Sequence, residues 1–158
     1  MNRPFRPRTG VDPVLRARAR RRALQAIYAW QISGGTAQQL IAQFAHEQAH
    51  EVADLAYFED LVSGVLAQRV SLDQAIAPHL DRSVEEVDAI ERAVLRLSAY
   101  ELLHRMDVPY RVVINEAIEI AKRFGSEHGH TYVNGVLDRA SAQWRQAEVQ
   151  SSRGGGRH

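Results

Sequence analysis

The 158-residue sequence contains no cysteine, five prolines and 11 aromatic residues. Without cysteine, the chain can form neither disulfide bonds nor thiolate metal sites. No apolar run approaches the roughly 18–20 residues that a membrane-spanning helix needs. The N-terminus is basic but lacks the apolar stretch of a signal peptide. Together these absences predict a cytoplasmic protein.

Several signatures of enzymes are also missing. The sequence contains no phosphate-binding G-x-G-x-x-G or G-x-x-x-x-G-K-[ST] motif and no G-x-S-x-G nucleophile motif. The hydrophobic fraction of 45% and the charged fraction of 25% are ordinary for one soluble globular domain. Alanine, leucine, glutamate, glutamine and arginine are abundant, which favours helix over strand. We therefore predict an all-α protein without catalytic activity, cofactor or bound metal.

The net charge of +1 conceals an uneven distribution of charge. Residues 1–22 carry seven more positive charges than negative ones, because Asp12 is the only acid there; the basic residues are Arg3, Arg6, Arg8, Arg16, Arg18, Arg20, Arg21 and Arg22. The remaining residues are acidic overall. A basic arm on an acidic body predicts a polyanionic partner, although the arm could also serve only as a solubilising tail.

The first helix has clear sequence boundaries. Residues 1–12 contain two prolines and a glycine and are expected to form a flexible basic arm. Asp12 followed by Pro13 is typical of a helix start, and Gly34 with Gly35 predicts the end of the helix. Its apolar stripe consists of Ala19, Ala23, Ala26, Ile27 and Trp30. Arg16 lies one turn earlier on this stripe, so we expect the helix to begin outside the packed body with its arginines in solvent.

The same reasoning predicts about seven helices in all. Capping boxes at Thr36–Gln39 and Ser83–Glu86 indicate two helix starts, and the second opens a long, highly buried segment to about Met106. Asp54 is a candidate cap for a third helix. Further apolar faces occur before Pro78 and on either side of Gly125. The predicted helical domain spans 13–146, and 147–158 is predicted to be a flexible Ser/Gly/Arg tail.

One metal-site motif occurs on a predicted helix. The run from His46 to His50 fits the H-E-x-x-H pattern of zinc proteases. The usual continuation is missing, because Ala53 and Ala56 stand where a glycine and a third histidine would be expected. A pattern with three fixed letters also arises easily in a helix that contains glutamate and histidine, so we do not expect a catalytic metal centre here.

Four ordered stretches resemble the NusB family over about residues 16–145. They are RRRALQAIYAWQ (20–31), YFEDLVSGV (57–65), ERAVLRLSAYELLHRMDVPYRVVINEAIEIAKRFGSE (91–127) and YVNGVLD (132–138). The resemblance implies two packed three-helix bundles. It also implies a transcription antitermination factor that binds boxA single-stranded RNA together with the tenth small-subunit ribosomal protein (NusE). Through other Nus factors and RNA polymerase, such a factor supports transcription of ribosomal RNA operons.

The resemblance also assigns roles to individual residues. It places RNA phosphate contacts on Arg16, Arg18 and Arg20. The cluster is extended by Arg21 and Arg22. An aromatic RNA contact is implied at Tyr132, and His128 stands where some relatives carry an acid near the RNA. The ribosomal-protein interface is expected to include Tyr28, which lies in line with Arg21 and Gln25, and Glu91.

Two alternatives come from other functional classes. A NusB-like domain also forms the RNA-binding part of some ribosomal-RNA cytosine methyltransferases, which would make this chain a fragment. Some relatives form homodimers that cover the RNA-binding face, so the chain could also be a self-associating helical protein.

Overall fold

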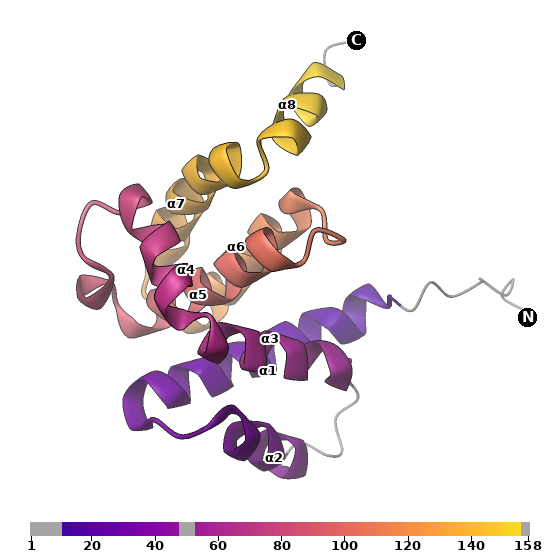
Figure 1. The fold of residues 1–158 in the computed structure, drawn as a ribbon, viewed down its shortest axis with the longest axis vertical. Helices are drawn as coiled ribbons and strands as arrows, with labels where there is room; N and C mark the ends of the chain where they lie inside the picture. Colours follow the sequence, from indigo (N-terminus) through magenta and orange to yellow (C-terminus); the bar gives the residue numbers. More distant parts are fainter. Residues whose placement is uncertain (1–10, 48–52, 156–158) are drawn as a thin grey trace, which may run out of the picture.

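The computed structural model describes residues 11–47 and 53–155, and these residues form helices joined by short turns (Figure 1). No strand occurs in these two ranges, which confirms the all-α prediction. The α-helices are α1 (Pro13–Ser33), α2 (Ala37–Glu47), α3 (Leu55–Ala67), α4 (Arg69–Ile76), α5 (Ala89–His104), α6 (Tyr110–Phe124), α7 (Gly129–Trp144) and α8 (Gln146–Gly155). Two short 3-10 turns, η1 (Ala77–His79) and η2 (Val84–Glu86), precede α5.

The first helix has the predicted boundaries. The Asp12 carboxylate accepts hydrogen bonds from the backbone amides of Val14 and Leu15, and Pro13 occupies the first helical position. At the other end, Gly34 and Gly35 have φ angles of 77° and 105°, which side chains with a Cβ rarely adopt. This conformation ends α1 and turns the chain toward α2.

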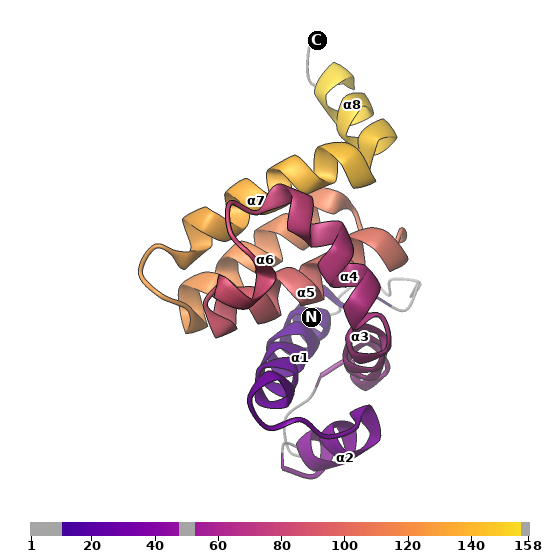
Figure 2. The same cartoon turned by 60° about the vertical axis from the view of Figure 1, so that its left-hand side comes forward.

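Helices α1, α2 and α3 pack together as an N-terminal bundle (Figures 1 and 2). The Thr36–Gln39 capping box forms at the start of α2, as predicted. Asp54 caps α3 by accepting a hydrogen bond from the backbone amide of Tyr57. Short-range sequence signals therefore fix the start of each of these helices.

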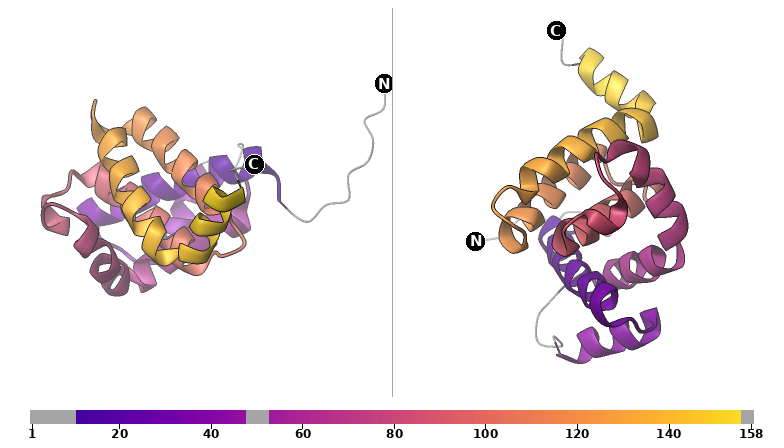
Figure 3. Two further views of the ribbon diagram at one scale, coloured as in Figure 1. Left: turned by 90° about the horizontal axis from the view of Figure 1, so that it is seen from above. Right: turned by 90° about the vertical axis from the view of Figure 1, so that its left-hand side faces the viewer.

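Helices α5, α6 and α7 form a second bundle, and α1 and α3 pack against α5 (Figure 3). As predicted, α5 is highly buried, since every residue from Ala93 to Leu102 is shielded from solvent. Helix α4 lies on α5 and connects the bundles. The observed packing matches the predicted pair of three-helix bundles.

The predicted start of the long central helix is too early. The capping box at Ser83 and Glu86 forms, but it opens only the turn η2. Val87 and Asp88 then adopt extended ψ angles of 138° and 143°, and α5 begins at Ala89. The prediction failed because the same capping motif can start one turn or a whole helix.

A second difference concerns the predicted tail, where residues 146–155 form α8. The helix follows α7 after a bend and projects from the body (Figure 2). Val149 is buried, and the Glu148 carboxylate accepts a hydrogen bond of 2.9 Å from the backbone amide of Tyr110. These contacts tie the first turns of α8 to the N-terminus of α6, so the segment is not the coil that its composition predicts.

Candidate nucleic-acid interface

The N-terminal half of α1 carries the arginines expected to bind RNA, but Arg20 lies in the core. Its side chain faces Glu101 of α5, which is itself only 1% exposed. The Arg20 Nε donates to both Glu101 carboxylate oxygens at 3.0 Å, and Nη2 lies 2.9 Å from Oε2. Burial acts to lower the pKa of Arg20, but the Glu101 carboxylate outweighs this effect and raises it. Arg20 is therefore committed to an ion pair between α1 and α5.

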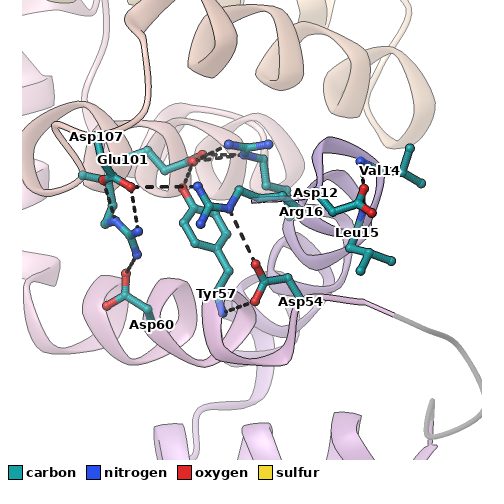
Figure 4. Close-up of polar contacts among 11 residues, drawn as sticks. Asp12, Val14, Leu15, Arg16, Asp54, Tyr57, Asp60, Glu101 and Asp107 are labelled. Atoms are coloured by element: carbon teal, nitrogen blue, oxygen red, sulfur yellow. Dashed lines mark hydrogen bonds and ion pairs between the residues drawn. The ribbon is translucent and has the colours of Figure 1, made fainter. Parts of the chain in front are cut away.

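Tyr57 and Arg16 extend this buried network (Figure 4). The Tyr57 hydroxyl donates a hydrogen bond to Glu101. Burial, followed by the charge of Glu101, raises the pKa of Tyr57 well above its ordinary value. The Arg16 guanidinium lies 3.9 Å from the centre of the Tyr57 ring and 3.7 Å from the Asp54 carboxylate. Figure 4 shows Arg16 and Tyr57 lying between Asp54 and Glu101.

These contacts correct two predictions. The start of α1 does not extend into solvent, because Asp54 donates its backbone amide to Leu15 O and Arg16 packs on α3. Arg20 and Arg22 are both 3% exposed, so these arginines of α1 do not lie in solvent, contrary to the prediction. The helical stripe should have indicated this outcome, since Arg16 and Arg20 continue the apolar face.

Arg18 and Arg21 occupy the opposite, partly exposed side of α1. They are three residues apart and therefore share one helix face. Burial lowers the pKa of Arg21, and the like charges of Arg123 and Arg18 lower it further. The arginines of α1 and α6 thus approach one another closely enough to repel.

A hollow of about 450 Å³ separates α1 from α6 beside these arginines. Its cationic lining consists of Arg21, Lys122 and Arg123, and two acids, Glu116 and Glu119, line it as well. Lys122 and Arg123 are exposed in the last turn of α6. Sequence reasoning did not select these two residues, although basic residues just before Gly125 were a visible signal.

The expected aromatic contact lies beyond the turn that joins α6 to α7. Tyr132 is partly exposed, and the Arg82 guanidinium lies 4.7 Å from the centre of its ring. The Tyr132 hydroxyl donates a long hydrogen bond of 3.3 Å to Asp81. His128 is exposed at the N-cap of α7 and lines a hollow of about 230 Å³ with Tyr132 and Arg82. The structure therefore brings His128 and Tyr132 together.

Tyr28 and Glu91, expected to contact a ribosomal protein, have different surroundings. Tyr28 is 36% exposed on α1, and Ile32 follows one turn later at 61% exposure. Glu91 is only 3% exposed, and its carboxylate accepts hydrogen bonds from Ser126. Tyr28 thus lies on an accessible apolar surface, whereas the Glu91 carboxylate is used inside the chain.

The possible zinc motif receives no support from the part of the chain that the structure describes. His46 and Glu47 are exposed at the end of α2, and the remainder of the motif, 48–50, lies outside the described residues. Within the described residues, no group of three or more histidines, aspartates or glutamates could hold a metal ion. The helices of the same residues include none that is long and apolar enough to cross a membrane.

Comparison with known sequences identifies a large family. The profile of the NusB family matches residues 17–142. A transcription antitermination protein NusB from Xanthomonas axonopodis pv. citri (strain 306) is 80% identical over 145 residues, covering 92% of this chain and 91% of the relative. The protein of the same description from Xanthomonas oryzae pv. oryzae (strain PXO99A) is 81% identical over 141 residues, covering 89% and 90%.

Solved structures agree with the sequence matches. NusB of T. maritima superposes with a TM-score of 0.72 at 32% identity, covering 80% of this chain and 90% of that one. A crystal structure of the antitermination factors NusB and NusE in complex with double-stranded RNA gives a TM-score of 0.70 at 26% identity, covering 78% and 93%. The matches confirm the predicted family and a function in antitermination rather than catalysis. The chain belongs to the NusB family.

Proposed function

We propose that this chain binds boxA single-stranded RNA jointly with the tenth small-subunit ribosomal protein (NusE), and thereby supports transcription of ribosomal RNA operons in the cytoplasm. RNA polymerase and the other Nus factors are engaged indirectly. The observation that carries the proposal is the exposed stripe of α1, which is basic at Arg18 and Arg21 and apolar at Tyr28 and Ile32. The solved relative that contains NusB, NusE and RNA supports the same pair of partners.

The RNA follows the basic side of this stripe onto the end of α6. We term Arg18, Arg21, Lys122 and Arg123 the basic edge. The last three line the hollow between α1 and α6, and Arg18 lies one helical turn before Arg21 on the same face of α1. This arrangement suits phosphate binding, because a bound phosphate reduces the mutual repulsion of these cations. Beyond the α6–α7 turn, Tyr132 offers an aromatic ring on which an unstacked base can stack, with His128 beside it. The proposed RNA contacts do not include Arg16 and Arg20, which form ion pairs with Asp54 and Glu101. They also exclude Arg22, which is buried.

Replacing both Arg18 and Arg21 with alanine should weaken binding to a boxA RNA about tenfold near physiological salt. Each lost phosphate contact should reduce the slope of log affinity against log salt by about 0.7, so the double variant should lose about 1.4. Fluorescence anisotropy at several salt concentrations, with and without NusE, measures both quantities.

Arg111→Ala is the control for the loss of one exposed arginine, because it removes a single positive charge from the opposite end of α6. Its affinity and salt slope should equal those of the unmodified protein. If Arg111→Ala and the double variant behaved alike, the basic edge would not be the RNA site. A scrambled RNA tests whether binding is selective for boxA.

An acidic residue on the apolar part of the stripe should impair binding of the ribosomal protein. Tyr28→Asp and Ile32→Asp each place a charge where the proposal buries an apolar side chain. We expect each to weaken NusE binding at least about tenfold, which corresponds to ~1.4 kcal/mol. Calorimetric titration of NusE into each variant, without RNA, measures this effect.

Val70→Asp serves as the control for those variants. Val70 is an exposed aliphatic residue on α4, comparable in exposure to Ile32. This change should leave NusE binding intact, and all three variants should bind RNA alone normally. Unchanged NusE affinity in Tyr28→Asp and Ile32→Asp would remove the ribosomal protein from this face of α1.

A further inference from the structure

The turn between α6 and α7 is built around a carboxylate from another helix. Glu91 lies in the first turn of α5 and is 3% exposed. Its Oε2 accepts a hydrogen bond of 3.0 Å from the backbone amide of Ser126 and a longer one of 3.3 Å from the Ser126 hydroxyl. A single side chain of α5 therefore holds the centre of the turn.

Two glycines make room for this carboxylate. A Cβ added at Gly125 or at Gly129 would collide with the Glu91 carboxylate. Neither glycine has a positive φ angle, since only Gly34 and Gly35 do so among the described residues. The glycines on both sides of Ser126 are thus needed for space rather than for an unusual backbone conformation.

The same turn carries the residues proposed to meet bases of the RNA. His128 occupies the N-cap position of α7, and Tyr132 follows one helical turn later. The basic edge ends at Arg123, just before the turn begins. Glu91 lines the hollow that contains His128 and Tyr132, so its carboxylate lies beneath the RNA-facing surface.

We propose that Glu91 is a positioning residue of the RNA site, which fixes the α6–α7 turn so that Tyr132 and His128 lie in line with the basic edge. This inference rests on the proposed RNA-binding function. It differs from the role in ribosomal-protein contact that the family resemblance implies. The burial of Glu91 and its bonds to Ser126 support a role within the chain. The function of Glu91 then depends on the length and shape of its side chain, not on its charge.

Three substitutions at this position separate shape from charge. Glu91→Gln keeps the length and an acceptor oxygen but loses the charge, whereas Glu91→Asp keeps the charge but is one methylene too short. We expect Glu91→Gln to bind boxA RNA within about twofold of the unmodified protein. Glu91→Asp and Glu91→Ala should bind about five- to tenfold more weakly. All three should retain affinity for NusE measured without RNA.

Gly129→Ala perturbs the turn while keeping Glu91 itself. Its added Cβ collides with the carboxylate, so it should weaken RNA binding to a similar extent and leave NusE binding unchanged. Val65→Ala, in the core of α3, controls for loss of stability, because it removes buried volume far along the chain from the turn. It should lower the unfolding midpoint with no change in RNA affinity.

The pattern across these variants decides the question. If Glu91→Gln lost NusE binding while Glu91→Asp retained it, Glu91 would be an ionic contact to the ribosomal protein and our inference would be wrong. Unchanged RNA affinity in Glu91→Ala and Gly129→Ala would also overturn it. The proposed function fails by a different result, namely normal RNA binding when Arg18 and Arg21 are both replaced.

Discussion

Replacing Glu101 with alanine should lower the free energy of unfolding by about 3–5 kcal/mol, the usual cost of breaking a buried ion pair by removing one partner. Glu101 is enclosed among apolar residues of α5, yet it receives Arg20 from α1 and the Tyr57 hydroxyl from α3. Without it, the buried guanidinium loses its counter-charge and the hydroxyl loses its acceptor. Urea denaturation followed by circular dichroism would measure the difference.

Two further variants test this explanation. Glu119→Ala removes an exposed carboxylate from α6 and should change stability by less than about 0.5 kcal/mol. The double replacement Arg20→Met with Glu101→Leu removes both charges and should recover most of the lost stability, because no charge is left buried alone. A loss below about 1 kcal/mol in Glu101→Ala would show that the pair is not a main link between α1 and α5.

Replacing Arg145 with alanine should cost about 2–4 kcal/mol, because a buried guanidinium that caps a helix would be lost. Arg145 lies between α7 and α8 and is 4% exposed. It donates to the carbonyl oxygens of Leu102 and Arg105 at 2.8 and 3.0 Å. These carbonyls belong to the C-terminal end of α5, where cations are favoured by the helix dipole. Thermal and urea denaturation would measure the loss.

The matched control is Arg153→Ala, which removes the same type of side chain from an exposed site on α8. It should leave stability unchanged within about 0.5 kcal/mol. Truncation after Arg145 should also destabilise the protein, since Glu148 and its bond to the start of α6 are lost. If Arg145→Ala unfolded at the same urea concentration as Arg153→Ala, the capping role would be rejected.

Local sequence signals predicted most helix boundaries. Asp12 with Pro13, the Thr36–Gln39 box and Asp54 each act within three residues of the helix start that they fix. The period of the apolar residues predicted which helices would be buried, including α5. These features depend on neighbouring residues, so one sequence is enough to find them.

Contacts between distant residues could not be predicted in this way. Arg20 looks like part of a basic arm until Glu101, 81 residues later, is placed beside it. An acid in the middle of a highly buried helix was a signal that Glu101 needs a buried partner, but it did not identify that partner. Burial of Glu91 likewise depends on Ser126 and on a turn 35 residues away.

For the C-terminal segment, the local sequence predicted a flexible tail where the structure has a helix. The composition of SSRGGGRH favours coil, and Gly and Ser are poor helix formers. Helix α8 nevertheless includes 151–155 of this stretch, because tertiary contacts of Glu148 and Val149 hold its first turns against the body. Propensity was therefore outweighed by packing that the segment itself does not reveal.

A consequence for assembly follows from the rigidity of α1. Arg18 and Ile32 lie on one face of a single uninterrupted helix, about 21 Å apart at 1.5 Å per residue. The ion pair between Arg20 and Glu101 fastens this helix to α5. The helix cannot change its length, so we expect the two ligands to be held at a constant spacing. If the RNA and the ribosomal protein bind α1 as proposed, cooperativity between them should arise from direct contact between the two ligands rather than from a change in the helix.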